Sequence, residues 1–199
     1  MKKILLFIVS MMFVVSGAMF SANADTIIIT PNTVVKWSGN SPGNPQAADI
    51  GKIVGNTSLN VTQLYKQNVG GEEEGSYAGS YSTKFFNEPL DPQDATITYV
   101  SGKPAISTAY PTYLLVKDGE AHTPVWYLFD LLNLDLDNDN IPEYVWNGTD
   151  TIKLNGFWTG PGAISHVTIF GTPVPEPATL LLLGFGLVGL ATAGRKFNK

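Results

Sequence analysis

Cysteine is absent from the 199-residue chain, and basic residues are scarce through most of it. The lack of cysteine excludes disulfide bonds, thiol catalysis, iron–sulfur clusters and zinc sites with thiolate ligands. Residues 25–174 contain seven lysines and no arginine against sixteen aspartates and glutamates, which gives this stretch a net charge of −9. A surface this acidic repels nucleic acid and anionic lipid, so neither is an expected partner.

The N-terminal residues 1–24 have the three-part pattern of a secretory signal peptide. Two lysines precede an apolar stretch, and Ala22 and Ala24 supply the small residues of a signal-peptidase site. We therefore predict cleavage between Ala24 and Asp25. The alternative is an uncleaved membrane anchor, which the small-x-small ending disfavours. The remaining residues 25–172 are long enough to bury the core of one domain without disulfide bonds.

The C-terminal residues contain an uncharged run, residues 178–194, rich in leucine and glycine. As a helix this run would span roughly 25 Å, the short limit for crossing a membrane. The basic residues Arg195, Lys196 and Lys199 follow, and the positive-inside rule keeps them in the cytoplasm. The domain is then expected on the opposite side of the membrane, in agreement with a signal peptide.

A proline-rich segment, Val174, Pro175, Glu176 and Pro177, precedes the apolar run and is predicted to be extended and rigid. Together with the apolar run and the basic end, it resembles the PEP-CTERM sorting signal of Gram-negative bacteria. The resemblance implies recognition at the inner membrane by an exosortase, a membrane-embedded cysteine transpeptidase. It also implies processing near these four residues, loss of the apolar helix, and transfer of the protein to the cell surface or beyond. The alternative is a permanent single-span anchor.

The residues between the two ends predict an all-β domain. Short segments rich in β-branched and aromatic residues alternate with turn residues, and only residues 47–54 favour a helix. This pattern favours an antiparallel β-sandwich or jelly-roll-like domain, flanked by the signal peptide helix and the C-terminal transmembrane helix. The expected strands are residues 26–30, 33–37, 62–66, 77–86, 95–100, 112–117, 125–131, 151–157 and 163–170.

An acidic segment, residues 135–143, is the best candidate for a metal site, because alternating carboxylates suit a hard cation such as calcium. Its spacing resembles the Asp-x-Asp-x-Asp loops of EF-hand and thrombospondin-type repeats. Asn140 departs from the usual glycine, and Trp146 stands where such loops have a bidentate glutamate. A solvated acidic turn is the alternative. The resemblance implies as calcium ligands the side chains of Asp135, Asp137, Asp139 and Glu143 and the backbone carbonyl of Ile141.

Aromatic residues suggest a second kind of binding site, because their faces pack against the apolar faces of sugars. We expect most of them in the core, with Trp146 and Trp158 as the exceptions because they flank loops. The acidic run of residues 72–74 is expected in a solvated loop, and His166 is expected to be packed or structural.

No nucleophile elbow or metal-hydrolase motif is present, and we predict no catalytic residue. We expect a non-enzymatic protein of the cell envelope or extracellular matrix, associated with extracellular polysaccharide. A carbohydrate-binding β-sandwich, stabilised by calcium, is the first alternative. A glycosidase is the second, since acidic residues are plentiful, but it requires two carboxylates that face each other in a cleft.

Overall fold

The structure is a computed structural model that describes residues 24–34, 36–86, 91–120, 122–137, 139, 141–159 and 162–172. The predicted signal peptide up to residue 23, the proline-rich segment, the apolar run and the basic end lie outside these residues. Within the part of the chain that is described, no helix is long and apolar enough to cross a membrane.

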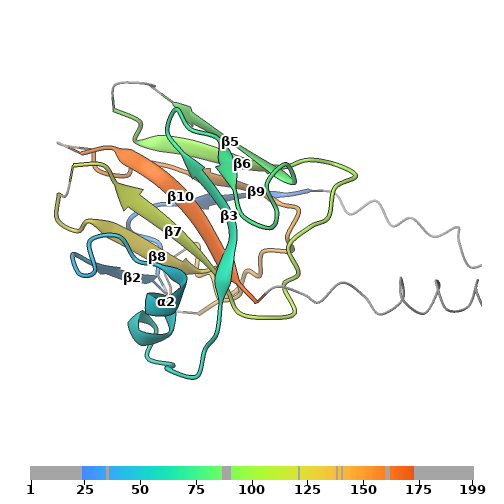
Figure 1. Ribbon diagram of the computed structural model, residues 1–199, viewed down its shortest axis with the longest axis horizontal. Coiled ribbons are helices and arrows are strands. Elements are labelled where there is room, and N and C mark those ends of the chain that lie inside the picture. The colour runs from blue at the N-terminus through green and yellow to red at the C-terminus, as the bar shows by residue number, and fades with distance from the viewer. Residues whose placement is uncertain are drawn as a thin grey trace, which may run out of the picture.

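The described residues form ten strands arranged in two sheets, which confirms the all-β prediction (Figure 1). The small sheet has four strands in the order β1 (Thr26–Ile29), β9 (Thr151–Leu154), β6 (Asp94–Tyr99) and β5 (Tyr81–Phe86). The large sheet has six in the order β2 (Lys36–Gly39), β8 (Trp126–Asp130), β7 (Thr112–Asp118), β10 (Ile164–Gly171), β3 (Thr62–Asn68) and β4 (Glu73–Glu74).

The main hydrophobic core is built from both sheets, as in a β-sandwich. Alternation along β1 explains its contribution, because Ile27 and Ile29 are buried while Ile28 is exposed. The inward residues of the other strands meet them in the same cluster. These include Phe85, Ile97 and Ile152 from the small sheet and Leu64, Leu114, Phe129, Val167 and Ile169 from the large sheet.

A second, smaller core lies on the other face of the large sheet, where the helix α2 (Ala47–Ile53) packs. Ile50 of this helix belongs to the same buried cluster as Leu115 of β7 and Leu128 of β8. The Asp49 carboxylate accepts a hydrogen bond of 2.9 Å from the Gln46 N–H, which fixes the start of the helix. The central strand β7 is therefore buried on both faces, and its nearly continuous apolar run follows from this. The predicted helix at residues 47–54 is confirmed.

One strand pair departs from the predicted antiparallel arrangement. β1 runs parallel to β9, with Thr26 opposite Thr151 and Ile29 opposite Leu154. Hydrophobic alternation gives the buried face of a strand but not its direction, and these two strands are far apart in sequence. The parallel pairing places the start of β1 beside the start of β9.

Further boundaries differ from the sequence prediction, and β9 ends at Leu154 rather than at residue 157. The second strand begins at Lys36, since Val34 forms only an isolated bridge, with Asp135. Residues 77–80 form turns before β5 rather than its first part. The expected loop at residues 72–74 is wrong in part, because Glu73–Glu74 pair with β3 as a short edge strand. An ion pair of 3.9 Å between Lys66 and Glu74 accompanies that pairing.

Candidate acidic loop and interstrand groove

The structure brings together the four carboxylates predicted to bind calcium. One carboxylate oxygen from each of Asp135, Asp137, Asp139 and Glu143 lies within 4.8 Å of the others. The bridge between Leu134 and Tyr144 closes this acidic loop, residues 135–143, at its base. Backbone hydrogen bonds of 3.0 and 3.1 Å between these two residues hold the ends together. The loop is thus a closed turn with converging acidic side chains.

Hydrogen bonds inside the acidic loop orient three of its carboxylates. The N–H of Leu136 donates to Glu143 Oε1 at 2.7 Å, and the N–H of Ile141 donates to Asp139 Oδ1 at 2.8 Å. The N–H of Asp139 donates to Asp137 Oδ1 at 3.2 Å. Each bond uses one oxygen of a carboxylate. Like charges this close repel one another, and a divalent cation would relieve that repulsion.

Burial within the acidic loop is one-sided. Asp135 is fully buried, whereas Asp137, Asp139 and Glu143 are exposed. Ile141, whose carbonyl was predicted as a ligand, is 63% exposed. A cation therefore has open access from solvent, and Asp135 would contact it from the protein side. Positions 138 and 140 lie outside the described residues.

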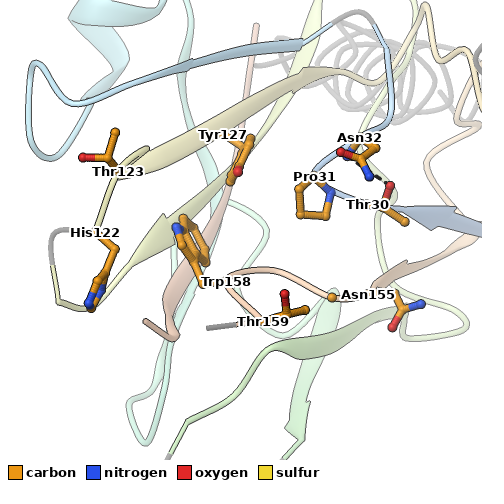
Figure 2. Close-up of a pocket in the computed structure, with 10 residues that line it drawn as sticks. Thr30, Pro31, Asn32, His122, Thr123, Tyr127, Asn155, Trp158 and Thr159 are labelled. Atoms are coloured by element: carbon orange, nitrogen blue, oxygen red, sulfur yellow. Dashed lines mark hydrogen bonds between the residues drawn. The ribbon is translucent and has the colours of Figure 1, made fainter. Parts of the chain in front are cut away.

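A groove of about 680 Å³ lies where one end of the small sheet meets β8 of the large sheet (Figure 2). Three regions distant in sequence line it: the turn at residues 30–32 after β1, residues 122–123 together with Tyr127 of β8, and the loop after β9. Tyr127 and Trp158 lie at its centre, between the end formed by His122 and Thr123 and the end formed by residues 30–32 (Figure 2). The sequence carried no signal for this groove, because only the fold brings the three regions together.

Aromatic rings form the wall of the groove. The ring centroids of Tyr127 and Trp158 are 5.4 Å apart, and Phe157 packs behind them at 5.5 Å from Tyr127. The Trp158 indole N–H donates to the carbonyl of Pro124 at 2.8 Å, which fixes the orientation of the ring. Trp158 has a φ of 50°, a left-handed conformation that is unfavourable for a bulky residue. Strained residues of this kind concentrate at functional sites.

The two tryptophans expected to be exposed are both buried, so that prediction is wrong. Trp146 is fully buried and donates its indole N–H to the carbonyl of Asp150 at 2.9 Å, while Trp158 is 8% exposed. Their loops fold back over the core, and the indole N–H groups find backbone carbonyls there. The expectation that most aromatic residues belong to the core is confirmed.

The polar groups of the groove are available to a ligand. Within the described residues, the side chains of Asn32, Asn155, Thr123 and Thr159 and the Tyr127 hydroxyl have no intramolecular hydrogen bond. Burial raises the pKa of Tyr127, so its hydroxyl stays protonated and can donate. The described lining contains no aspartate, glutamate, lysine or arginine. This chemistry suits an uncharged ligand that carries hydroxyl groups.

His122 is held at the rim of the groove by the buried carboxylate of Asp118. Its ring Nδ1 lies 3.2 Å from Asp118 Oδ2, and the same carboxylate accepts backbone N–H bonds from Glu120, His122 and Ala163. Burial acts to raise the pKa of Asp118, but these hydrogen bonds together hold it below its ordinary value. Asp118 therefore stays ionised and positions the loop before β8.

Comparison with known proteins locates a family signature only in the C-terminal residues. No curated protein and no solved structure matches the chain. Residues 173–196 match the PEP-CTERM protein-sorting motif, and they include the predicted residues Val174, Pro175, Glu176 and Pro177 as well as Arg195 and Lys196. The motif implies export, a membrane-anchored precursor and subsequent delivery to the cell surface. The chain therefore carries a PEP-CTERM sorting signal and is an exported protein that depends on an exosortase for its sorting.

Proposed function

We propose that the β-sandwich is a non-enzymatic component of the cell envelope or extracellular matrix, released from its precursor by exosortase processing within residues 174–177. The sorting motif at residues 173–196 carries this proposal. β10 ends at Gly171, so processing at the motif separates every described strand from the apolar run. The association with the inner membrane is then transient, and the acidic domain is the part that is delivered.

A role without catalysis fits the chemistry of the groove. Glycoside hydrolysis requires two carboxylates that face each other across the substrate. The described lining of the groove contains no carboxylate, and the Asp118 carboxylate behind it is buried and occupied by hydrogen bonds. The acidic residues that do converge lie in the acidic loop, where three of the four are open to solvent.

Processing is tested by expressing the full chain in host cells with and without the exosortase. We expect mature protein to end near residue 177 in wild-type cells and to keep Lys199 in the deletion strain, as mass spectrometry of the C-terminal peptide would reveal. In cell fractionation, the protein should be found in the surface or medium fraction only when the exosortase is present, and in the membrane fraction when it is absent. A variant with alanine at Pro175, Glu176 and Pro177 should behave as in the deletion strain. An intact Lys199 end on mature wild-type protein contradicts the proposal.

A second candidate function is binding of a neutral oligosaccharide in the groove, supported by its aromatic wall and its unpaired amide and hydroxyl groups. The groove volume of about 680 Å³ falls within the usual range for small-molecule sites. The half-buried ring of Tyr127 offers apolar surface, and Asn32 and Asn155 offer both donors and acceptors for sugar hydroxyls. An uncharged lining on an otherwise acidic domain favours a neutral glycan over an anionic one.

Calorimetric titration with neutral oligosaccharides of two to four sugar units tests this candidate. We expect Asn32→Ala and Asn155→Ala each to weaken binding about tenfold, because each removes hydrogen bonds to the ligand. Asn60→Ala is the matched control, since Asn60 is exposed and lies outside the groove lining. Absence of binding to any such sugar, or binding that both groove variants leave unchanged, contradicts the candidate.

We also propose that the acidic loop binds calcium, as its sequence spacing predicts. The convergence of four carboxylate oxygens within 4.8 Å supports this proposal. The cation would tie together the acidic loop and, through Asp135, the bridge to Val34. Such a site would make the exported domain more stable outside the cell, where calcium is abundant.

A further inference from the structure

Asp150 is a buried carboxylate at the point where β9 begins. It is 3% exposed, and the backbone N–H of Asp25 donates to its Oδ1 at 2.8 Å. The amide of Asn147 donates to the same oxygen at 2.8 Å, and the Tyr144 hydroxyl donates to Oδ2. The Thr151 N–H donates in turn to the carbonyl of Asp25 at 2.8 Å. Asp25 is thus fixed to Asp150 and Thr151 by two hydrogen bonds.

No described lysine, arginine or histidine forms an ion pair with Asp150. Buried carboxylates are usually compensated by a positive charge or by several hydrogen bonds, because their desolvation is costly. Among the described residues, the donors to Asp150 in the precursor are all neutral: one backbone amide, one side-chain amide and one hydroxyl. Of these three donors, only the nitrogen of Asp25 can become a cation, through cleavage of the peptide bond that precedes it.

We propose that Asp150 is the receptor for the new amino terminus that signal-peptide cleavage creates. Hydrolysis of the Ala24–Asp25 bond converts the Asp25 amide nitrogen into an α-amino group, which takes up a proton and becomes an ammonium ion. The nitrogen that donates to Asp150 as a neutral amide then donates as a cation, and the hydrogen bond becomes an ion pair. The inference depends on cleavage at this predicted bond.

The parallel pairing of β1 with β9 explains why Asp25 and Asp150 are in contact. Both strands start at the same end of the small sheet, so the residue before β1 lies beside the residue before β9. The ion pair would stabilise β1, the edge strand that follows the cleavage site. It would also hold Tyr144, which closes the base of the acidic loop. Export and folding are then coupled, because cleavage of the signal peptide makes the folded domain more stable than it is in the precursor.

Two purified chains in detergent test the inference: residues 25–199, with a free amine on Asp25, and residues 21–199, with the native peptide bond at Asp25. Both chains keep the N–H of Asp25, so they differ at Asp150 chiefly by one positive charge. We expect the unfolding equilibrium constant of the longer chain to be about tenfold larger in urea titrations at pH 7, since charged hydrogen bonds are stronger than neutral ones.

Asp150→Asn should abolish that difference, while Tyr144→Phe should keep it, because the latter removes a donor but leaves the carboxylate. If Asp150→Asn does not fold, the two wild-type chains still decide the matter. Equal stability of these two chains overturns the inference. N-terminal sequencing of protein exported by the host should begin at Asp25, and any other start also overturns it. Neither result depends on exosortase processing at the opposite end of the chain.

Discussion

His166 lies in the middle of β10 with only 6% of its surface exposed. Burial, together with the positive charges of Lys66 and Lys117, lowers its pKa from 6.5 to about 4. The folded domain therefore holds this imidazole neutral above about pH 4. The burial of His166 agrees with the expectation of a packed structural histidine. Its lowered pKa makes the stability of the domain depend on pH.

The sign of that sensitivity follows from proton binding. The unfolded chain takes up a proton on His166 near pH 6.5 and the folded chain only near pH 4, so acid favours unfolding. Stability from this residue is complete above pH 6.5 and falls by roughly 3 kcal/mol as the pH drops to about 4. His166→Gln should remove most of the difference between urea unfolding midpoints at pH 7 and pH 4.5. An unchanged difference in the variant would contradict this assignment.

Asp118 does not interfere with that measurement, because its carboxyl group takes up a proton at lower pH than His166 does. Its pKa is lowered from the ordinary 3.8 despite burial, through four hydrogen bonds. A depressed carboxyl pKa stabilises the fold above the unfolded value and loses that contribution as the pH falls through the folded value. Acid unfolding should thus show one phase from His166 and a second, more acidic phase to which Asp118 contributes.

At the residue level, the sequence predicted chemistry better than exposure. The carboxylates of Asp135, Asp137, Asp139 and Glu143 do converge, because their spacing is a local property of one turn. The loops that flank Trp146 and Trp158 predict exposed side chains, yet both residues are buried. Their indole N–H groups donate to backbone carbonyls, that of Asp150 in the same loop for Trp146 and that of Pro124, 34 residues away, for Trp158. Periodicity carries no information about how a loop folds back.

At the level of elements, the acidic loop gives a prediction about metal dependence. A site with the affinity typical of extracellular calcium modules, about 0.1–1 mM, should stabilise the domain by about 1–3 kcal/mol in 10 mM calcium. Thermal unfolding with and without calcium measures this. The double variant Asp137→Asn, Asp139→Asn should lose the effect while still folding, because both side chains are exposed.

Glu72→Gln is the control for general charge effects, since Glu72 is exposed and lies outside the acidic loop. It should keep the full stabilisation by calcium. If calcium causes no thermal shift in the wild-type chain, or if the shift persists in the double variant, the acidic loop is a solvated turn and not a calcium site.

Strand positions were largely predictable, whereas strand partners were not. β3, β6, β7, β8 and β10 lie within two residues of their predicted bounds, because alternation and turn residues mark them. The parallel partnership of β1 with β9, and the pairing of Glu73–Glu74 with β3, depend on tertiary packing. The groove was unpredictable for the same reason, since its three lining regions meet only in the folded domain.

The whole molecule divides into a domain to be delivered and a signal that delivers it. The buried hydrophobic residues of the described structure lie between Ile27 and Phe170, and the sorting motif begins at residue 173. A protein that loses its tail on maturation must fold without it. The described core meets this requirement, because both sheets and the helix α2 are complete by Gly171.

A truncation tests this division. The chain of residues 25–172 should unfold in urea with a free energy within about 0.5 kcal/mol of the chain of residues 25–199 in detergent, because no described core residue is removed. A chain that ends at residue 163 is the matched control. It lacks β10, which pairs with both β7 and β3 in the large sheet, and it should not fold. A marked loss of stability in the 25–172 chain would mean that the sandwich needs its tail, and release by processing would then yield an unstable product.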